Sequence, residues 1–296
     1  MNIERKKPHN ALKQTHLDLK SFSLSGFSIS GLATYHLLPE LNFAVDMGEC
    51  PISAIPIDHV FLTHAHGDHS RCLMRHHSLR KMMNIPKDAA YYLSESIYKQ
   101  AVQWIRSEAL FEGVPEDRIQ TPNLIPLKTG QKTHLQYRKN LALEAFEVNH
   151  SVPALGFTLF DYKKKLKEEY LSYSPQEIIQ LRKNNTLITN DIYTPIITFM
   201  GDCRSDSLTS NDSIWNSPVL VMECTFIDEN EETMATKKGH THLNQIIQIF
   251  NEKKEEIRCE TIVLNHFSMK YSTKHIINTL KQKLPDFIKN KVMLMI

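Results

Sequence analysis

Short apolar runs separated by polar turns recur along most of the chain, and their lengths are those of β-strands. Residues 32–38 and 41–47 flank Pro39-Glu40 and predict a β-hairpin. Four more apolar runs predict strands over 58–63, 89–93, 141–150 and 155–162. Ser94 is a predicted N-cap for a helix that ends near residue 107, because apolar residues recur there at helical spacing.

Strands and helices alternate in the last third of the chain. The predicted strands cover 196–200, 219–222, 261–264 and 292–296, and the predicted helices cover 242–257 and 272–284. No internal repeat interrupts this order. Such alternation is typical of an α/β protein built from packed layers.

Two polar segments depart from this pattern. Residues 1–20 are polar and basic and predict a flexible N-terminal tail, which leaves 21–296 as a single domain. Residues 163–190 are polar and charged. Within them, Ser174-Pro175-Gln176-Glu177 is a capping box with proline at the first helical position, which is typical of a helix start.

Composition narrows the functional classes. The chain has 296 residues, 41% hydrophobic and 23% charged, as in ordinary globular proteins. Its net charge of +2 gives no overall nucleic-acid signal, so an anionic substrate would have to be attracted locally. The nine glycines form no phosphate-binding loop. Five scattered cysteines, no apolar leader and no membrane-length apolar stretch predict a cytoplasmic protein without a membrane segment.

The strongest chemical signal is a histidine cluster that directly follows the apolar residues 60–62. The pattern H-x-H-x-D-H is formed by His64, His66, Asp68 and His69. Strand alternation brings His64 and His66 out on the same side, and imidazole and carboxylate groups suit Zn, Mn or Fe. A histidine-rich surface loop is the alternative, but four potential ligands at this spacing behind a strand disfavour it.

Three further candidate ligands, His150, Asp202 and His266, each follow a predicted strand. A single histidine or aspartate in such a place is more often a turn former or a satisfied polar residue. Together with the first cluster they make seven ligands, which is too many for one tetrahedral zinc and suits two ions that share a carboxylate. The sequence therefore predicts metal-assisted hydrolysis.

The H-x-H-x-D-H pattern resembles the metal-binding signature of the metallo-β-lactamase superfamily. Within that superfamily, four other segments are similar to motifs of tRNase Z, the endoribonuclease that trims the 3′ ends of tRNA precursors. These segments are 149–156, Gly201-Asp202, Glu223-Cys224-Thr225-Phe226 with Gly239-His240-Thr241-His242, and 264–271. Residues 31–284 resemble the short, plant-type form of the enzyme.

The resemblance implies a four-layer αβ/βα sandwich, two Zn²⁺ ions (with Mn²⁺ or Mg²⁺ as alternatives), precursor tRNA as substrate and a homodimer. It also implies a role for each matching residue. His64, His66 and His150 would hold one zinc; Asp68, His69 and His266 would hold the other; Asp202 would bridge them. Asp68 would also orient or deprotonate the attacking water, and Glu223 and His240 would protonate the leaving ribose oxygen.

Two nearby residues have competing interpretations. His242 is a second candidate for the proton donor, but we expect it to be an N-terminal helix residue because the glycine-preceded position favours His240. Asp46 matches a buried aspartate of the family that forms hydrogen bonds near the ligands. A simple turn-forming aspartate is the other interpretation.

The chain also departs from the family pattern. Ser70-Arg71-Cys72-Leu73 follows the first motif, where a Gly-Gly pair is usual. The Gly-Pro arm of many bacterial members is absent, and the lysines of 163–167 in its place are either a tRNA contact or a solvated loop. A basic run over 71–81 could receive phosphates.

Two other functions stay open on the sequence alone. One is a hydrolase of the same fold that acts on cyclic nucleotides or other small phosphodiesters, and Glu223 and His240 argue against it. The other is an inert, metal-stabilised RNA-binding protein, which the full set of ligands disfavours.

Overall fold

The computed structural model describes residues 13–296. The first twelve residues of the predicted tail lie outside the described residues. Thr15–Asp18 is not a tail but strand β1, which pairs antiparallel with β2. Leu17 packs against the core between the sheets, and the Thr15 hydroxyl donates a hydrogen bond to the backbone oxygen of Ile296 at 2.6 Å. The tail prediction is therefore wrong for this strand.

Among residues 13–296, the first sheet contains eight strands. Their order is β1-β2-β3-β4-β5-β6-β7, and β14 pairs with β2 off this path. The bounds are β1 (Thr15–Asp18), β2 (Ser23–Ser30), β3 (Ala33–Leu38), β4 (Phe43–Val45), β5 (His59–Phe61), β6 (Ala90–Ser94), β7 (Asn123–Leu127) and β14 (Phe267–Ser268). The pairing of β3 with β4 is antiparallel, which confirms the predicted hairpin.

In the described part of the chain, the second sheet contains seven strands in the order β15-β13-β12-β11-β10-β9-β8. The bounds are β8 (Lys132–Leu135), β9 (Arg138–Val148), β10 (Ala154–Leu166), β11 (Thr189–Phe199), β12 (Val219–Glu223), β13 (Thr261–Asn265) and β15 (Val292–Leu294). The helices are α1 (Gly67–Ser70), α2 (Leu73–Met82), α3 (Tyr98–Phe111), α4 (Pro175–Lys183), α5 (Glu232–Lys238), α6 (Leu243–Glu252), α7 (Thr273–Lys283) and α8 (Asp286–Lys289).

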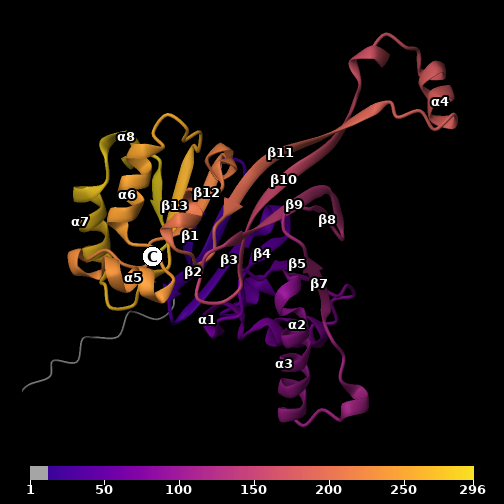
Figure 1. Ribbon diagram of the computed structural model, residues 1–296. Helices are drawn as coiled ribbons and strands as arrows, with labels where there is room; N and C mark the ends of the chain where they lie inside the picture. Colours follow the sequence, from indigo (N-terminus) through magenta and orange to yellow (C-terminus); the bar gives the residue numbers. More distant parts are fainter. Residues whose placement is uncertain (1–12) are drawn as a thin grey trace, which may run out of the picture.

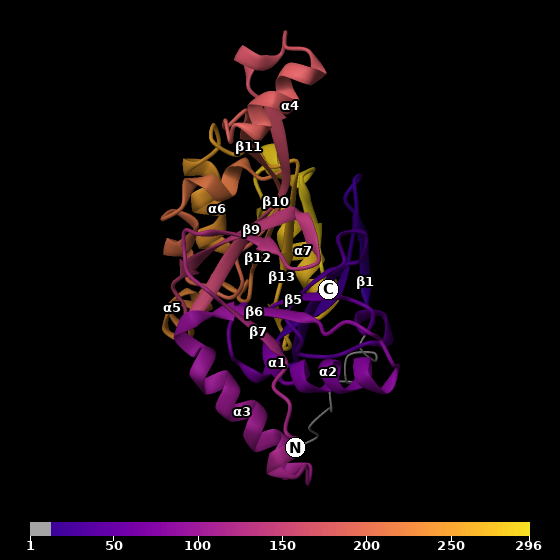
Figure 2. The same cartoon turned by 90° about the vertical axis from the view of Figure 1, so that its right-hand side faces the viewer.

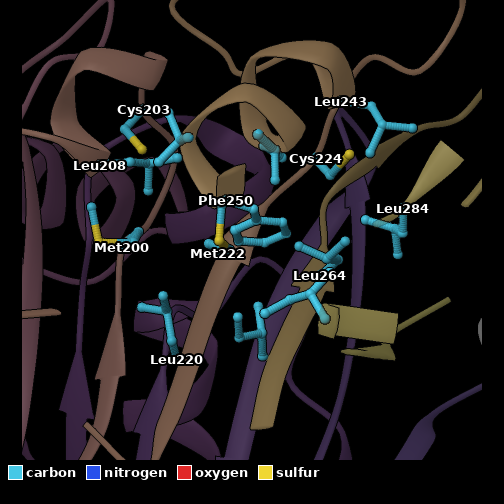
Figure 3. Close-up of a cluster of buried hydrophobic side chains, with 14 of the residues drawn as sticks. Met200, Cys203, Leu208, Leu220, Met222, Cys224, Leu243, Phe250, Leu264 and Leu284 are labelled. Carbon is cyan, nitrogen blue, oxygen red and sulfur yellow. The ribbon is translucent and has the colours of Figure 1, made fainter. Parts of the chain in front are cut away.

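The two sheets pack face to face with helices on both outer sides (Figures 1 and 2). Between them, the ring of Phe61 lies 4.2 Å from that of Phe157, centroid to centroid. Helices α6 and α7 cover the second sheet with a cluster that includes Phe250, Leu264 and Leu284 (Figure 3). Helices α2 and α3 cover the first sheet. The predicted four-layer αβ/βα arrangement is confirmed.

This topology brings chain segments that follow four strands to one edge of the sandwich. Strands β11, β12 and β13 run parallel, so their carboxyl ends meet there, and β5 ends at the same edge in the other sheet. The Leu155 N–H donates a hydrogen bond to the Thr63 backbone oxygen at 2.9 Å and joins the two sheets at this point. Ligands of open α/β sheets bind at such edges.

Strands β10 and β11 are longer than the sequence predicts and form an arm that projects from the body, with α4 near its tip (Figure 1). Their antiparallel ladder continues through the charged residues, pairing Lys163 with Ile192 and Lys165 with Asn190. The predicted strands stop earlier because the outer ladder, the β10–β11 pairs from Lys163 outward, has no apolar face and therefore no apolar alternation in its sequence. The capping box at Ser174 and Glu177 is confirmed.

Helix α2 was not predicted, and three of its basic residues, His76, His77 and Arg80, are buried and so cannot contact phosphates. The Arg80 side chain is buried. Its guanidinium donates hydrogen bonds to the backbone oxygens of Ile55 (2.8 Å), Ile57 (2.8 Å) and Lys87 (2.9 Å) and to the Asp58 carboxylate (2.6 Å). Arg80 therefore ties α2 to the loop before β5.

Arg80→Ala is expected to lower the free energy of unfolding by roughly 3 kcal/mol or more, because it removes the charged partner of a partly buried carboxylate and the guanidinium donor of three carbonyl oxygens. Urea unfolding of the purified variant measures this loss. Arg75 on the same helix is exposed, so Arg75→Ala should change the stability by no more than about 0.5 kcal/mol. Equal stability of both variants would contradict the structural role of Arg80.

Candidate active site

The histidine motif spans the loop after β5, with His64 and His66, and helix α1, with Asp68 and His69. The Ser70 hydroxyl donates hydrogen bonds to the backbone oxygens of Ala65 and His66, at 3.2 and 3.0 Å. Gly48 is needed beside this loop, because a Cβ atom there would overlap the Asp68 carbonyl oxygen. Ser70 thus stabilises the loop where the family pattern has glycine.

Three imidazole rings point their nitrogens at one position. The His66 Nδ1 atom lies 3.1 Å from His64 Nε2 and 3.2 Å from His150 Nε2. Burial lowers the pKa of each of these histidines, most strongly that of His64. Three neutral imidazoles that face one another across such short gaps offer three lone pairs to a cation.

A second group lies directly beside the first. Its nitrogens, His69 Nε2 and His266 Nε2, are 3.3 Å apart, and the Asp68 Oδ2 atom lies 3.8 and 3.6 Å from them. Asp202 Oδ2 lies 3.3 Å from both of these nitrogens and 3.8 Å from His64 Nε2. The Asp202 carboxylate therefore reaches both groups.

The structure brings together all seven residues that the sequence predicts as metal ligands. His69 shows the electrostatics of the site: burial alone would lower its pKa, but the carboxylates of Asp202 and Asp46 raise it well above the usual value. These carboxylates create a negative potential where a cation would lie.

The fit of these residues to a metal ion can be judged from the ring nitrogens that face away from the cluster. His69 Nδ1 lies 2.7 Å from Asp46 Oδ2, and His150 Nδ1 donates to the Gly239 backbone oxygen at 2.7 Å. Acceptors in these places hold the proton on Nδ1 and leave the Nε2 lone pair free for a cation. The residues present therefore fit divalent metal ions.

Asp46 has the first of its two predicted roles, that of a buried aspartate that forms hydrogen bonds near the ligands. Besides its contact with His69, its Oδ1 atom accepts a hydrogen bond from the Thr63 N–H at 2.8 Å. Asp46 adopts a left-handed backbone conformation with φ of 61°, and His266 does the same with φ of 57°. Such backbone strain costs about 1–3 kcal/mol per residue and concentrates at functional sites.

Glu223 and His240 form a pair at the edge of this cluster. His240 Nδ1 lies 2.9 Å from Glu223 Oε1 and 3.9 Å from Asp202 Oδ2. Glu223 is buried, and it also accepts hydrogen bonds from the backbone N–H groups of Cys203 (2.8 Å) and Thr241 (3.2 Å). Burial would lower the pKa of His240, but Glu223 raises it to about 9. His240 can therefore carry a proton at neutral pH.

Comparison with known proteins places this site in a family. The sequence model of the Beta-lactamase superfamily domain matches residues 44–267. The chain is 32% identical to "tRNase Z TRZ2, chloroplastic" of Arabidopsis thaliana, over 92% of this chain and 75% of that protein. It is 31% identical to "tRNase Z TRZ1" of the same plant, over 95% of this chain and 97% of that protein. The chain belongs to the tRNase Z family.

Solved structures agree on the fold. The short form of human tRNase Z superposes with a TM-score of 0.56 at 16% identity, covering 83% of this chain and 92% of that one. A metallo-beta-lactamase fold protein of Bacillus subtilis superposes with a TM-score of 0.56 at 13% identity, covering 90% and 93%. The fold of this tRNase Z family member is thus a metallo-β-lactamase sandwich.

His242, the rival of His240, is occupied as a helix cap in this family member. Its Nδ1 atom accepts a hydrogen bond from the Asn244 N–H at 3.1 Å, and its Nε2 atom donates one to the Asp228 backbone oxygen at 2.8 Å. Both ring nitrogens are therefore engaged, and the expectation of an N-terminal helix residue is confirmed.

Sequence reasoning missed the residues that support the ligands of this tRNase Z family member. Thr63, Thr225 and Gly239 each place an acceptor near the Nδ1 atom of a candidate ligand histidine. Two features of the sequence point to them. One is the glycine at position 239, which is required because the backbone there adopts φ of 81° and leaves no room for a Cβ atom beside His150. Thr225 lies two residues after Glu223, and such spacing places side chains on one side of an extended segment.

Proposed function

We propose that this chain is an endoribonuclease that cuts precursor tRNA on the 3′ side of the discriminator base with the help of two zinc ions. The observation that supports this most is the Glu223–His240 pair, whose imidazole lies 3.9 Å from the carboxylate that reaches both ligand groups. The tRNase Z relatives are similar to the chain over nearly its whole length.

Two divalent ions in such a site supply Lewis acidity for the phosphate and a hydroxide nucleophile near neutral pH. His64, His66 and His150 would hold one ion, Asp68, His69 and His266 the other, with Asp202 between them. Asp68 would orient the attacking water or accept its proton. Its carboxylate is fixed by the Gly31 N–H, which donates to Oδ2 at 2.7 Å.

His240 would complete the reaction as general acid. The bond between phosphorus and the 3′ oxygen of the discriminator ribose breaks, and that oxygen receives the His240 proton. The tRNA keeps a 3′-hydroxyl, and the trailer keeps the phosphate. Glu223 holds Nδ1 of the ring, so the opposite N–H is available as donor.

The arm supports a large substrate rather than a small phosphodiester. Residues 163–190 contain six basic and three acidic residues, and Lys163, Lys164 and Lys165 are exposed on the outer ladder. Backbone phosphates dominate the affinity of proteins for nucleic acids. We propose that these lysines contact tRNA, although neighbouring Asp161 already pairs with Lys163 at 2.6 Å.

Replacing Lys164 and Lys165 together with glutamate is expected to raise KM for precursor tRNA about tenfold or more and to flatten its salt dependence. The rate on bis(p-nitrophenyl) phosphate should stay the same, because the arm projects away from the body. Steady-state kinetics at two salt concentrations measure both. The control is Lys99→Glu at an exposed lysine of α3. An unchanged KM for the arm variant would assign these lysines to a solvated surface.

The substrate class is tested by comparing kcat/KM for precursor tRNA, a cyclic nucleotide and bis(p-nitrophenyl) phosphate, with His66→Ala as the metal-site control. We expect precursor tRNA to be preferred by several orders of magnitude and all hydrolysis to be lost in the variant. A higher kcat/KM for a cyclic nucleotide would instead support the small-phosphodiester alternative.

We also propose that the protein acts as a homodimer in the cytoplasm. Five free cysteines suit a reducing compartment, although one relative is named chloroplastic. Large apolar side chains are exposed at the ends of α2 and α3, at Met82 and Phe111. Among residues 13–296, no helix has the length and hydropathy to cross a membrane. Sedimentation should give twice the monomer mass of 34.3 kDa, and a monomer would contradict the proposal.

A further inference from the structure

Thr225 lies between the ligand cluster and the proton-donor pair. It follows β12 two residues after Glu223 and is buried. Its hydroxyl contacts Glu223 Oε2 and lies 3.0 Å from His266 Nδ1. The same hydroxyl is 3.4 Å from His240 Nδ1. One side chain thus contacts both parts of the site.

The direction of these hydrogen bonds follows from the donors available. The Glu223 carboxylate already accepts from two backbone N–H groups and from His240, so it acts as an acceptor. A threonine hydroxyl has one proton to donate, and here that proton goes to Glu223. The lone pairs of Thr225 Oγ1 then accept the N–H of His266 Nδ1.

This arrangement determines the tautomer of His266. With the proton on Nδ1, the Nε2 atom presents its lone pair to the carboxylates of Asp68 and Asp202, where a cation would lie. Within the described part of the chain, the Thr225 hydroxyl is the hydrogen-bond partner of His266 Nδ1. The Thr225 hydroxyl therefore positions both His266, a candidate metal ligand, and Glu223, the carboxylate that orients the proton donor His240.

We propose that Thr225 is a positioning residue that couples zinc binding at His266 to the orientation of the Glu223–His240 pair. The proposal rests on the proposed two-zinc function. It assigns Thr225 no contact with substrate. Loss of the hydroxyl leaves the His266 Nδ1 proton without an acceptor and Glu223 Oε2 without one donor. Both metal affinity and leaving-group protonation should then weaken.

The test measures zinc affinity by competition with a chelator, which needs no RNA. Thr225→Val keeps the shape of the side chain and removes the hydroxyl, and we expect it to lower zinc affinity by about 10–100-fold. Thr225→Ser keeps the hydroxyl and should stay within about threefold of the unchanged protein. The matched control is Thr158→Val, which removes a buried hydroxyl that pairs with Thr198 at 2.8 Å.

A folded Thr225→Val protein with unchanged zinc affinity would overturn the proposal, and circular dichroism with urea unfolding establishes that it is folded. If valine prevents folding, Thr225→Ala takes its place, and unchanged zinc affinity of that variant has the same consequence. The outcomes separate this inference from the substrate assignment. If zinc affinity falls in Thr225→Val but not in Thr225→Ser, and the protein nevertheless does not cut tRNA, only the proposed substrate is contradicted. If the protein without any substitution binds no zinc, both the role of Thr225 and the proposed two-zinc function are contradicted.

Discussion

Asp202→Ala is expected to reduce precursor tRNA cleavage by roughly 10³-fold or more, because metal ions contribute several kcal/mol of transition-state stabilisation. The Asp202 Oδ2 atom lies 3.3 Å from the Nε2 atoms of both His69 and His266, and 3.8 Å from that of His64. Removing it takes away the carboxylate that joins the two ligand groups. Zinc content, measured by mass spectrometry, should fall below two ions per chain.

The matched control for this variant is Asp212→Ala. Asp212 is exposed, and its carboxylate pairs with Lys253 at 2.8 Å on the surface. Its loss should leave zinc content and cleavage rate unchanged. A protein with Asp202→Ala that still holds two zinc ions and cleaves at the normal rate would refute the bridging role.

His240→Ala is expected to lower kcat by about 10²–10⁴-fold while zinc content stays at two ions, as for loss of a general acid. The physical reason is the contact of its Nδ1 atom with Glu223 at 2.9 Å, which raises the pKa of the ring to about 9 and keeps it protonated at neutral pH. Single-turnover cleavage of precursor tRNA, with metal analysis of the same sample, measures both quantities.

His242→Ala separates the two histidines of this segment. His242 caps α6 with both ring nitrogens engaged, so its loss should lower the free energy of unfolding by about 1 kcal/mol and leave kcat unchanged. If His242→Ala lost as much kcat as His240→Ala, the assignment of the proton donor would be wrong.

The convergence of the candidate ligands was predictable from the sequence because the ligands follow strands. His64 and His66 come after β5, Asp202 after β11 and His266 after β13, and these strand ends meet at one edge. The spacing of an individual histidine does not reveal its partner. The contacts of Asp46 with His69 and of Thr225 with His266 join residues 23 and 41 positions apart, and only the fold brings them together.

The missed elements share a different cause, which is that polar residues were interpreted as exposed. Arg80 is buried because three backbone oxygens and Asp58 satisfy its donors, and no hydrophobic pattern signals such a site. The outer ladder of the arm was missed for a related reason. Lys163 to Lys165 form strand pairs with no core beneath them, so apolar alternation is absent although the backbone hydrogen bonds continue.

The most direct test of the central claim is to map cleavage of an end-labelled precursor tRNA by the purified protein, with and without chelator. The account predicts one cut on the 3′ side of the discriminator base, with a 3′-hydroxyl on the tRNA. This cut should disappear with chelator and return with zinc. An intact precursor, under conditions in which the same sample hydrolyses bis(p-nitrophenyl) phosphate, would contradict the account.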